Sequence, residues 1–247
     1  NIIITGGAGF IGSNCIREFL KTNKYKILNI DLLTYAGNSL TIKDFENENN
    51  YSFVKGDIGD DLFLKEEINK FKPDFIINFA AESHVDRSIT SSLPFIKTNI
   101  LGTYFLLENS LSYLNKIDGE KKSDFRFLHV STDEVFGSLA ENEYFTEDSR
   151  YDPSSPYSAS KASSDHLVRA WNRTYKLPTL ITNCSNNFGP YQFPEKLIPL
   201  VILNAINERP IPIYGKGDQI RDWLHVNDHI SAIETVLIKG KIGQTYN

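Results

Sequence analysis

Short apolar segments alternate with longer amphipathic segments along this chain. Strand-like apolar runs occupy residues 1–5, 26–31, 52–57, 74–80, 126–131 and 179–185. Segments with helical periodicity occupy residues 10–22, 61–71, 93–115, 157–176 and 195–207. Strands that are apolar throughout and are separated by helices are typical of a parallel sheet with helices on both faces. The pattern therefore predicts an α/β fold with a doubly wound parallel sheet of the Rossmann type.

This rhythm loosens after about residue 190, where prolines become frequent in "GPYQFP", "IPL" and "RPIPIYGKGD". We expect residues 1–185 to form the sheet domain. Residues 186–247 are expected to form part of a smaller substrate-binding region that is interleaved with it. The last residues, "GQTYN", have the pattern of a further strand.

Composition narrows the class of protein. The 247 residues are 40% hydrophobic and 23% charged, as in globular domains. We see no secretory leader and no apolar run long enough to cross a bilayer. A net charge of −5 without a Lys/Arg block argues against nucleic acid or an anionic membrane as partner. Cys15 and Cys184 lack metal-ligand spacing, so we expect free thiols in a reducing cytoplasm and no metal site.

The segment "TGGAGFIG" joins the first predicted strand to the first predicted helix. Gly6, Gly9 and Gly12 permit a tight turn, close approach of the backbone to a pyrophosphate, and close helix–strand packing. Asp31 ends the second strand, where its carboxylate can accept both ribose hydroxyls. Because a carboxylate repels a 2′-phosphate and no Arg follows, the pattern favours NAD over NADP. The plainer alternative is a glycine-rich turn followed by a strand-end Asp.

Two further clusters carry titratable groups. Tyr157 and Lys161 are spaced i, i+4, so their side chains share one helical face. An ammonium beside a phenol, with a nicotinamide cation nearby, lowers the pKa of the phenol and makes it a usable base. In "STDEVFG", Asp133 and Glu134 follow a strand that we expect to be buried. They are either a turn cap and a solvated side chain, or an acid and a base held over a ligand.

Several longer stretches resemble the extended short-chain dehydrogenase/reductase family. They run from residue 5 to about residue 229: "TGGAGFIGSN", "DLLTYAGN", "NFAAESHVDRSI", "STDEVFG", "YSASKA", "TNCSNNFGPYQFPEKLIPL" and "IYGKGDQIRDWLHVNDH". The glycine loop and the Tyr/Lys pair identify only the superfamily. "STDEVFG" and "SNNFGPYQFPEKL" are similar to the branch that dehydrates dTDP-glucose. The resemblance also implies that the family continues beyond residue 247, so the substrate-binding region would be incomplete here.

The resemblance implies a dehydration by internal hydride transfer through bound NAD, in deoxysugar synthesis such as that of dTDP-rhamnose. Tyr157, helped by Lys161, would remove the O4 proton of the sugar, and Thr132 would hydrogen-bond O4. Glu134 would take the C5 proton, and Asp133 would protonate the departing O6. An elimination needs a base and an acid at the same time, which gives the adjacent carboxylates a role.

Matching positions imply two sets of binding residues. Besides the three glycines, Tyr157 and Lys161, cofactor contacts would come from Phe10, Ile11, Asp31, Leu32, Leu33, Thr34, Asp57, Ile58, Phe79, Ala80, Ala81, Ser83, Thr98 and Asn187. Contacts to the nucleotide sugar would come from Ser83, Thr132, Asn186, Lys196, Leu197, Pro212, Ile213, Tyr214 and Arg221. Lys196 and Arg221 suit a diphosphate, although without the resemblance the sequence favours exposed surface charges for both. Asp57 could instead cap the following helix.

Dehydratases of this family pair through two long helices, which implies a homodimer with a four-helix interface. Residues 93–115 and 157–176 are the candidates, with Phe105, Leu106 and Ala170 expected on their surface. Two other functions stay open. One is another NDP-hexose 4,6-dehydratase or a 4-epimerase, and the epimerase would leave the two acids without a role. The other is a non-catalytic NAD-binding sensor, which predicts loss of catalytic residues that are intact here.

Overall fold

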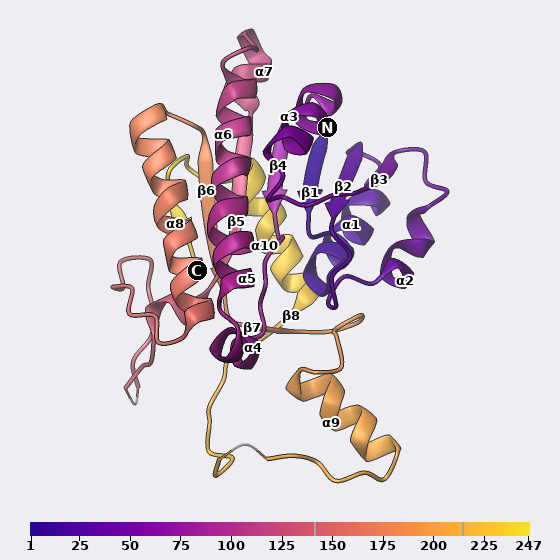
Figure 1. Ribbon diagram of the computed structural model, residues 1–247, viewed down its shortest axis with the longest axis vertical. Helices are drawn as coiled ribbons and strands as arrows, with labels where there is room; N and C mark the ends of the chain where they lie inside the picture. Colours follow the sequence, from indigo (N-terminus) through magenta and orange to yellow (C-terminus); the bar gives the residue numbers. More distant parts are fainter. Residues whose placement is uncertain (141, 214) are drawn as a thin grey trace.

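A seven-stranded sheet forms the centre of the computed structural model, which describes residues 1–140, 142–213 and 215–247 (Figure 1). The strand order is β3-β2-β1-β4-β5-β6-β9, and every pair is parallel. The strands are β1 (Ile2–Thr5), β2 (Ile27–Asp31), β3 (Tyr51–Lys55), β4 (Phe75–Asn78), β5 (Arg126–Thr132), β6 (Thr179–Cys184) and β9 (Thr245–Tyr246). The predicted doubly wound parallel sheet is confirmed, as is the strand pattern in "GQTYN".

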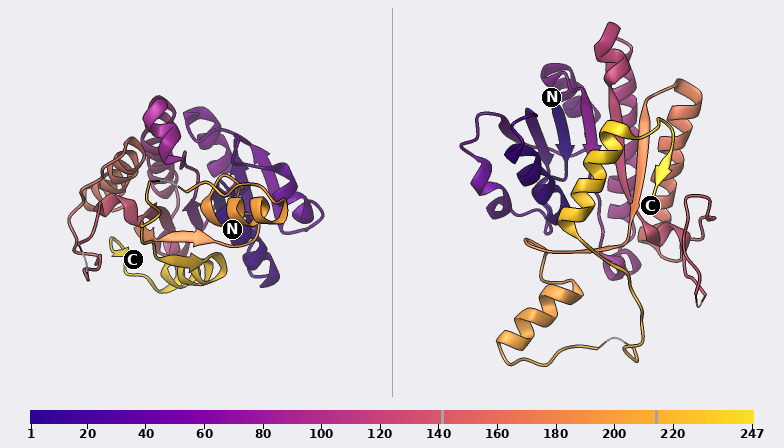
Figure 2. Two further views of the ribbon diagram at one scale, coloured as in Figure 1. Left: turned by 90° about the horizontal axis from the view of Figure 1, so that it is seen from below. Right: turned by 180° about the vertical axis from the view of Figure 1, so that it is seen from behind.

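Helices cover both faces of the sheet (Figures 1 and 2). One layer contains α1 (Phe10–Lys21) and α10 (Val226–Lys239), and the other contains α3 (Asp61–Phe71), α6 (Thr103–Leu114) and α8 (Pro156–Tyr175). Ile2 and Ile4 belong to the apolar cluster of the first layer, and Ile3 belongs to that of the second. All three are fully buried. Because successive residues of a strand point to opposite faces, a sheet covered on both faces needs apolar residues throughout.

Local capping signals set the helix boundaries. The Asp60 carboxylate accepts a hydrogen bond from the Phe63 N–H at the start of α3. Ser155 and Ser158 form a capping box at the start of α8, with Pro156 in the first turn. The helices predicted at 10–22, 61–71, 157–176 and 195–207 are confirmed to within two residues at each end.

The segment predicted as a single helix at 93–115 consists of three parts. These are α5 (Leu93–Phe95), a π-helix (Ile96–Gly102) and α6. The wider turns of the π-helix end at Gly102, which packs closely against Ile58. A Cβ on Gly102 would lie 2.6 Å from the Ile58 Cδ1. The expectation that Leu106 is exposed is wrong, because α6 packs against both α3 and α8 and buries it. Phe105 is half-buried and Ala170 is exposed.

Shorter elements connect these layers. They are α2 (Ser39–Ile42), η1 (Lys43–Phe45), α4 (Val85–Thr90), α7 (Gly119–Asp124), η3 (Asp133–Phe136), β7 (Asn186–Phe188), α9 (Leu197–Ile206) and β8 (Trp223–His225). β7 and β8 pair in parallel. Between them α9 stands apart from the sheet (Figures 1 and 2), and none of its residues is fully buried. None of the helices in the described ranges is long and apolar enough to cross a membrane.

Candidate active site

The carboxyl ends of strands β1 to β6 border one cavity of about 1030 Å³. Parallel sheets bind ligands at this edge, near the switch point of the strand order, which here lies between β1 and β4. Most of the predicted site residues line this cavity: Gly6, Gly9, Phe10, Ile11, Gly12, Asp31, Leu32, Thr34, Asp57, Ile58, Phe79, Ala80, Ala81, Ser83, Thr98, Thr132, Glu134, Tyr157, Lys161, Asn186, Asn187, Lys196, Leu197, Pro212, Ile213 and Arg221. Leu33 and Asp133 are not among its lining residues. Tyr214 lies outside the described residues.

The loop after β1 is closely packed backbone. Gly6 has φ +73°, and a Cβ on it would lie 2.6 Å from the Ala80 N. A Cβ on Gly12 would lie 2.4 Å from the Gly6 carbonyl oxygen, so a side chain cannot be added at either position without moving the backbone. Gly9 is the N-cap of α1, and no side chain caps this helix. The first N–H groups of α1 are therefore available to an anion, and the loop fits the pyrophosphate of a dinucleotide.

Asp31, at the end of β2, is oriented by two backbone amides. Its Oδ2 accepts from the Ala8 N–H at 2.9 Å, and its Oδ1 accepts from the Leu33 N–H at 2.7 Å. Burial raises the pKa of the Asp31 carboxyl, and these two hydrogen bonds act in the opposite direction. Leu33 thus serves the site through its N–H, in a left-handed conformation with φ +56°. Asp57 does not cap a helix; its Oδ1 accepts from the Gly59 N–H at 2.7 Å.

The "STDEVFG" segment turns sharply where β5 ends. The Thr132 Oγ1 accepts from the Glu134 N–H at 3.2 Å and donates to the Asp133 Oδ1 at 3.3 Å. Burial raises the pKa of the Asp133 carboxyl, against the hydrogen bond from Thr132. Burial also raises the pKa of Glu134, and the Asp133 charge raises it further, while Lys196 and Arg221 lower it. Glu134 lines the cavity, and Asp133 lies beside it.

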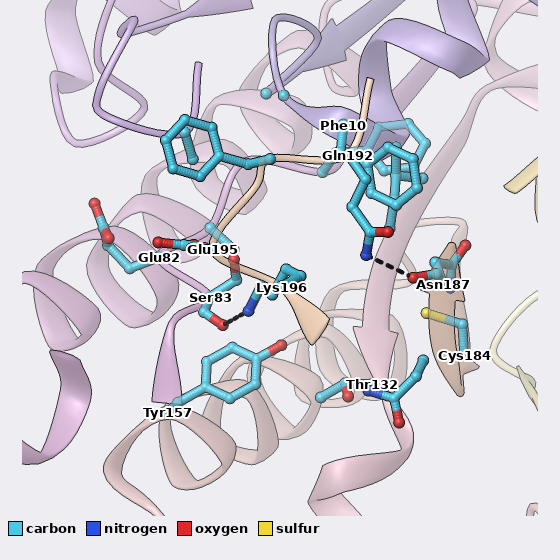
Figure 3. Close-up of a pocket in the computed structure, with 18 of the residues that line it drawn as sticks. Phe10, Glu82, Ser83, Thr132, Tyr157, Cys184, Asn187, Gln192, Glu195 and Lys196 are labelled. Atoms are coloured by element: carbon cyan, nitrogen blue, oxygen red, sulfur yellow. Dashed lines mark hydrogen bonds between the residues drawn. The ribbon is translucent and has the colours of Figure 1, made fainter. Parts of the chain in front are cut away.

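Tyr157 and Lys161 lie in the first two turns of α8. The Tyr157 hydroxyl points into the cavity (Figure 3). Burial raises the pKa of the Tyr157 phenol, and the charge of Glu134 raises it further. The Lys161 Nζ donates to the Val130 carbonyl at 2.9 Å, and burial lowers the pKa of this ammonium. Without a bound dinucleotide, the protein groups raise the pKa of this phenol, and the predicted lowering beside a nicotinamide cation stays a prediction.

Several lining residues were not predicted from the sequence: Cys184, Gln192, Phe193, Glu195 and Lys216. The position of Cys184 at the end of β6 was a usable signal, because every neighbouring strand end contributes to the site. The segment 192–195 was inside a matching motif, but its contacts were not predictable from spacing.

Specific contacts hold the segment before α9 over the cavity. The Gln192 Nε2 donates to the Asn187 carbonyl at 2.9 Å, and the Lys196 Nζ approaches the Ser83 carbonyl at 3.4 Å (Figure 3). The Glu195 Oε2 lies 3.4 Å from the His84 Nε2 and 4.0 Å from the Arg87 Nη2. The Arg87 guanidinium also stacks on the Tyr35 ring, 3.6 Å from its centroid. These contacts place Lys196 at the mouth of the site.

Comparisons with known proteins point to 4,6-dehydratases of sugar nucleotides. A family model described as GDP-mannose 4,6 dehydratase matches residues 3–247. The dTDP-glucose 4,6-dehydratase of Salmonella typhimurium is 57% identical, covering 100% of this chain and 71% of that protein. A crystal structure of the Bacillus anthracis dTDP-glucose 4,6-dehydratase in complex with NAD has a TM-score of 0.91 at 47% identity, covering 100% of this chain and 74% of that one. The crystal structure of DesIV, a dTDP-glucose 4,6-dehydratase from Streptomyces venezuelae with NAD and TYD bound, has a TM-score of 0.92 at 43% identity. The match covers 99% of this chain and 74% of that one.

Proposed function

The chain belongs to the dTDP-glucose 4,6-dehydratase family, and from this premise we propose that it converts dTDP-glucose to dTDP-4-keto-6-deoxyglucose with bound NAD. The reaction class is that of a lyase, and its product is a precursor for deoxysugars such as dTDP-rhamnose. The observation that carries the proposal is the convergence of Thr132, Glu134 and Tyr157 in the cavity that also contains the glycine loop and Asp31.

The cofactor would lie along the carboxyl ends of β1, β2 and β4. The redox chemistry, acceptance of a hydride from C4 and its return to C6, is what bound NAD supplies. The N-terminus of α1 would hold the pyrophosphate, and Asp31 would accept the ribose hydroxyls. The remaining cofactor contacts are assigned to the loop after β2 and to residues 57–58, 79–83, 98 and 187. Each of these segments contributes residues that line the cavity.

Tyr157 acts as the base for the O4 proton, and Thr132 hydrogen-bonds O4. Burial and the charge of Glu134 raise the pKa of the phenol. The phenol therefore acts as a base only when a nearby positive charge lowers that pKa. Lys161, on the same face of α8, supplies one such charge. Lys161 is 4% exposed, so its charge is only weakly screened by solvent.

Glu134 removes the C5 proton, and Asp133 protonates the departing C6 oxygen. A carboxyl whose pKa is raised by burial binds protons closer to neutral pH, which suits both roles. Asp133 lies beside the cavity, so its side chain has to turn inward when substrate is bound. A 4-epimerase needs neither group, which argues against the epimerase alternative.

The nucleotide sugar is assigned to the region 186–247. Lys196 and Arg221 are assigned to the diphosphate, because both are cations that line the same cavity as the proposed catalytic residues. Leu197, Pro212 and Ile213 form an apolar wall of the same cavity, suited to the base and sugar. Asn186 and Ser83 complete the proposed set.

We further propose a cytoplasmic homodimer that pairs through α6 and α8. Exposed apolar residues continue along this helix layer: Ile96 is 41% exposed and Leu101 is 46% exposed. Cys15 and Cys184 are free, which fits a reducing compartment. The dimer predicts twice the protomer mass in light scattering.

Mass spectrometry of three sugar nucleotides tests the activity. dTDP-glucose, UDP-glucose and GDP-mannose are each incubated with the protein, and the Tyr157→Phe variant serves as control. We expect loss of one water from dTDP-glucose alone, without net reduction of added NAD, and NAD that co-purifies through dialysis. Loss of water from another sugar would change the substrate and keep the mechanism. No reaction by a protein with bound NAD would contradict the proposal and favour the sensor.

A further inference from the structure

A buried polar cluster lies next to Lys161. Asp165, one turn further along α8, is 0% exposed, and His129 in β5 is 1% exposed. The His129 Nε2 lies 3.3 Å from the Lys161 Nζ and 3.5 Å from the Asp165 Oδ1. The imidazole therefore lies between a buried ammonium and a buried carboxylate.

The carboxylate of Asp165 is incompletely hydrogen-bonded. Its Oδ2 accepts from the Ser131 Oγ and from the Tyr151 hydroxyl, both at 2.8 Å. Among the residues that the structure describes, its Oδ1 accepts no hydrogen bond. A buried carboxylate with a free oxygen is costly unless positive charge compensates it. The Arg169 Nη2 donates to the Tyr151 hydroxyl at 2.7 Å and to the Thr245 Oγ1 at 3.1 Å, and the Lys161 charge lowers the pKa of Asp165 more than the Arg169 charge does.

We propose that Asp165 is a positioning residue, whose carboxylate acts across His129 to keep Lys161 charged and fixed on the Val130 carbonyl. The phenol of Tyr157 and a bound dinucleotide then face a Lys161 side chain that keeps its positive charge. This inference rests on the proposed function only in treating Tyr157 as the base that Lys161 assists.

The neighbouring titratable groups support this arrangement. Burial lowers the pKa of Lys161, and the charge of Asp165 opposes that shift. Burial and the Lys161 charge both lower the pKa of His129, so the imidazole is neutral and contributes no charge of its own. Cys184, which faces Lys161 from β6, has its pKa raised to about 12 by burial and is a neutral thiol. Burial raises the pKa of Asp165, and the charge of Lys161 opposes that shift, so each of the two groups favours the charged form of the other. Asp165 is thus the carboxylate of this cluster that supports the ammonium.

Replacement of Asp165 by Asn removes the charge of the side chain and keeps its packing. An amide at this position has nearly the same shape, and its oxygen can still accept from Ser131 and Tyr151. In the Asp165→Asn variant burial acts on Lys161 without opposition, so the ammonium loses its proton at lower pH. The matched control is Glu234→Gln, which removes a carboxylate that accepts from the Tyr25 hydroxyl at 3.1 Å on the opposite helix layer.

The direct measurement is the titration of Lys161 by NMR of protein with 13Cε-labelled lysine, its resonance being assigned as the one lost in Lys161→Gln. We expect the midpoint to fall by roughly one pH unit in Asp165→Asn and to stay unchanged in Glu234→Gln. The midpoint of the alkaline limb in the pH profile of kcat for dTDP-glucose should move to lower pH together with the Lys161 midpoint, while KM changes less than about twofold. The titration needs no turnover, so it distinguishes failure of this inference from failure of the proposed function.

A folded Asp165→Asn protein with an unchanged Lys161 midpoint overturns the inference. If this variant does not fold, Ser131→Ala combined with Tyr151→Phe takes its place. Burial raises the pKa of Asp165, and the two hydrogen bonds oppose that shift, so loss of both bonds raises the pKa further and weakens the negative charge. The Lys161 midpoint is then expected to fall by a smaller amount, and no fall in the folded double variant overturns the inference.

Discussion

Replacement of Glu134 by Gln tests the elimination step separately from the oxidation at C4. Gln has nearly the same size but cannot take the C5 proton. A general base contributes about 10²–10⁴-fold to a rate, which corresponds to roughly 3–5.5 kcal/mol of barrier. We therefore expect water loss to slow by about that factor.

The structure predicts that folding and the first proton transfer survive this change. Burial raises the pKa of Glu134 in the folded protein, so the carboxylate costs stability as pH rises through the raised pKa, and Gln removes that cost. The Glu134 charge is also the largest charge that raises the pKa of Tyr157, so its loss makes the phenol easier to deprotonate. The variant should be at least as stable as the parent at neutral pH.

The assay is quenched-flow mass spectrometry after reduction with borodeuteride, which labels keto sugars. In Glu134→Gln we expect a 4-keto sugar that retains its C6 hydroxyl to accumulate, with little dehydrated product. Urea unfolding of both proteins provides the folding control. Water loss within about threefold of the parent rate, in a protein of unchanged stability, would show that Glu134 is not the base.

Three further changes address the binding regions. In Gly12→Ala the new Cβ would lie 2.4 Å from a backbone oxygen, so we expect a loss of about 1–3 kcal/mol in urea unfolding and no co-purified NAD; retention of both would contradict the close packing. Asp31→Asn leaves one of its two amide donors without an acceptor, so NAD affinity measured by calorimetry should fall, with about 1–3 kcal/mol lost in unfolding; unchanged affinity would remove Asp31 from the site. Glu195→Gln releases His84 and Arg87, so we expect KM for dTDP-glucose to rise by roughly threefold to tenfold with kcat nearly unchanged; an unchanged KM would show that the segment is held by other contacts.

The fold was predictable where burial follows directly from the apolar pattern. Ile2, Ile3 and Ile4 are apolar at successive positions because each lies under a helix layer, and the other central strands repeat this pattern. α10 was missed although its five buried positions recur at helical spacing; only its packing on α1, a tertiary property, was beyond the local pattern. The π-helix was missed for a similar reason, since the approach of Gly102 to Ile58 is not visible in a local pattern.

The site was predictable in its positions and only partly in its electrostatics. The rule that strand ends meet at one edge placed Asp31, Thr132 and Glu134 in the same cavity. The rise that burial and Glu134 cause in the pKa of Tyr157 was not predictable, because spacing on α8 says nothing about depth of burial or about the direction of the Lys161 ammonium. Those properties depend on β5, which is distant in sequence.

The glycine loop has a consequence for how cofactor preference can evolve. The contacts proposed for it come from backbone atoms that are closely packed, so point mutations can damage the loop but have few ways to change its binding preference. In the proposed site, discrimination between NAD and NADP is concentrated at Asp31, whose carboxylate also accepts hydrogen bonds from two backbone amides. A lineage that acquires a preference for a 2′-phosphate has to gain a cation and replacement acceptors together. Single-step switching is therefore disfavoured, and engineered switching should begin from paired substitutions around the end of β2.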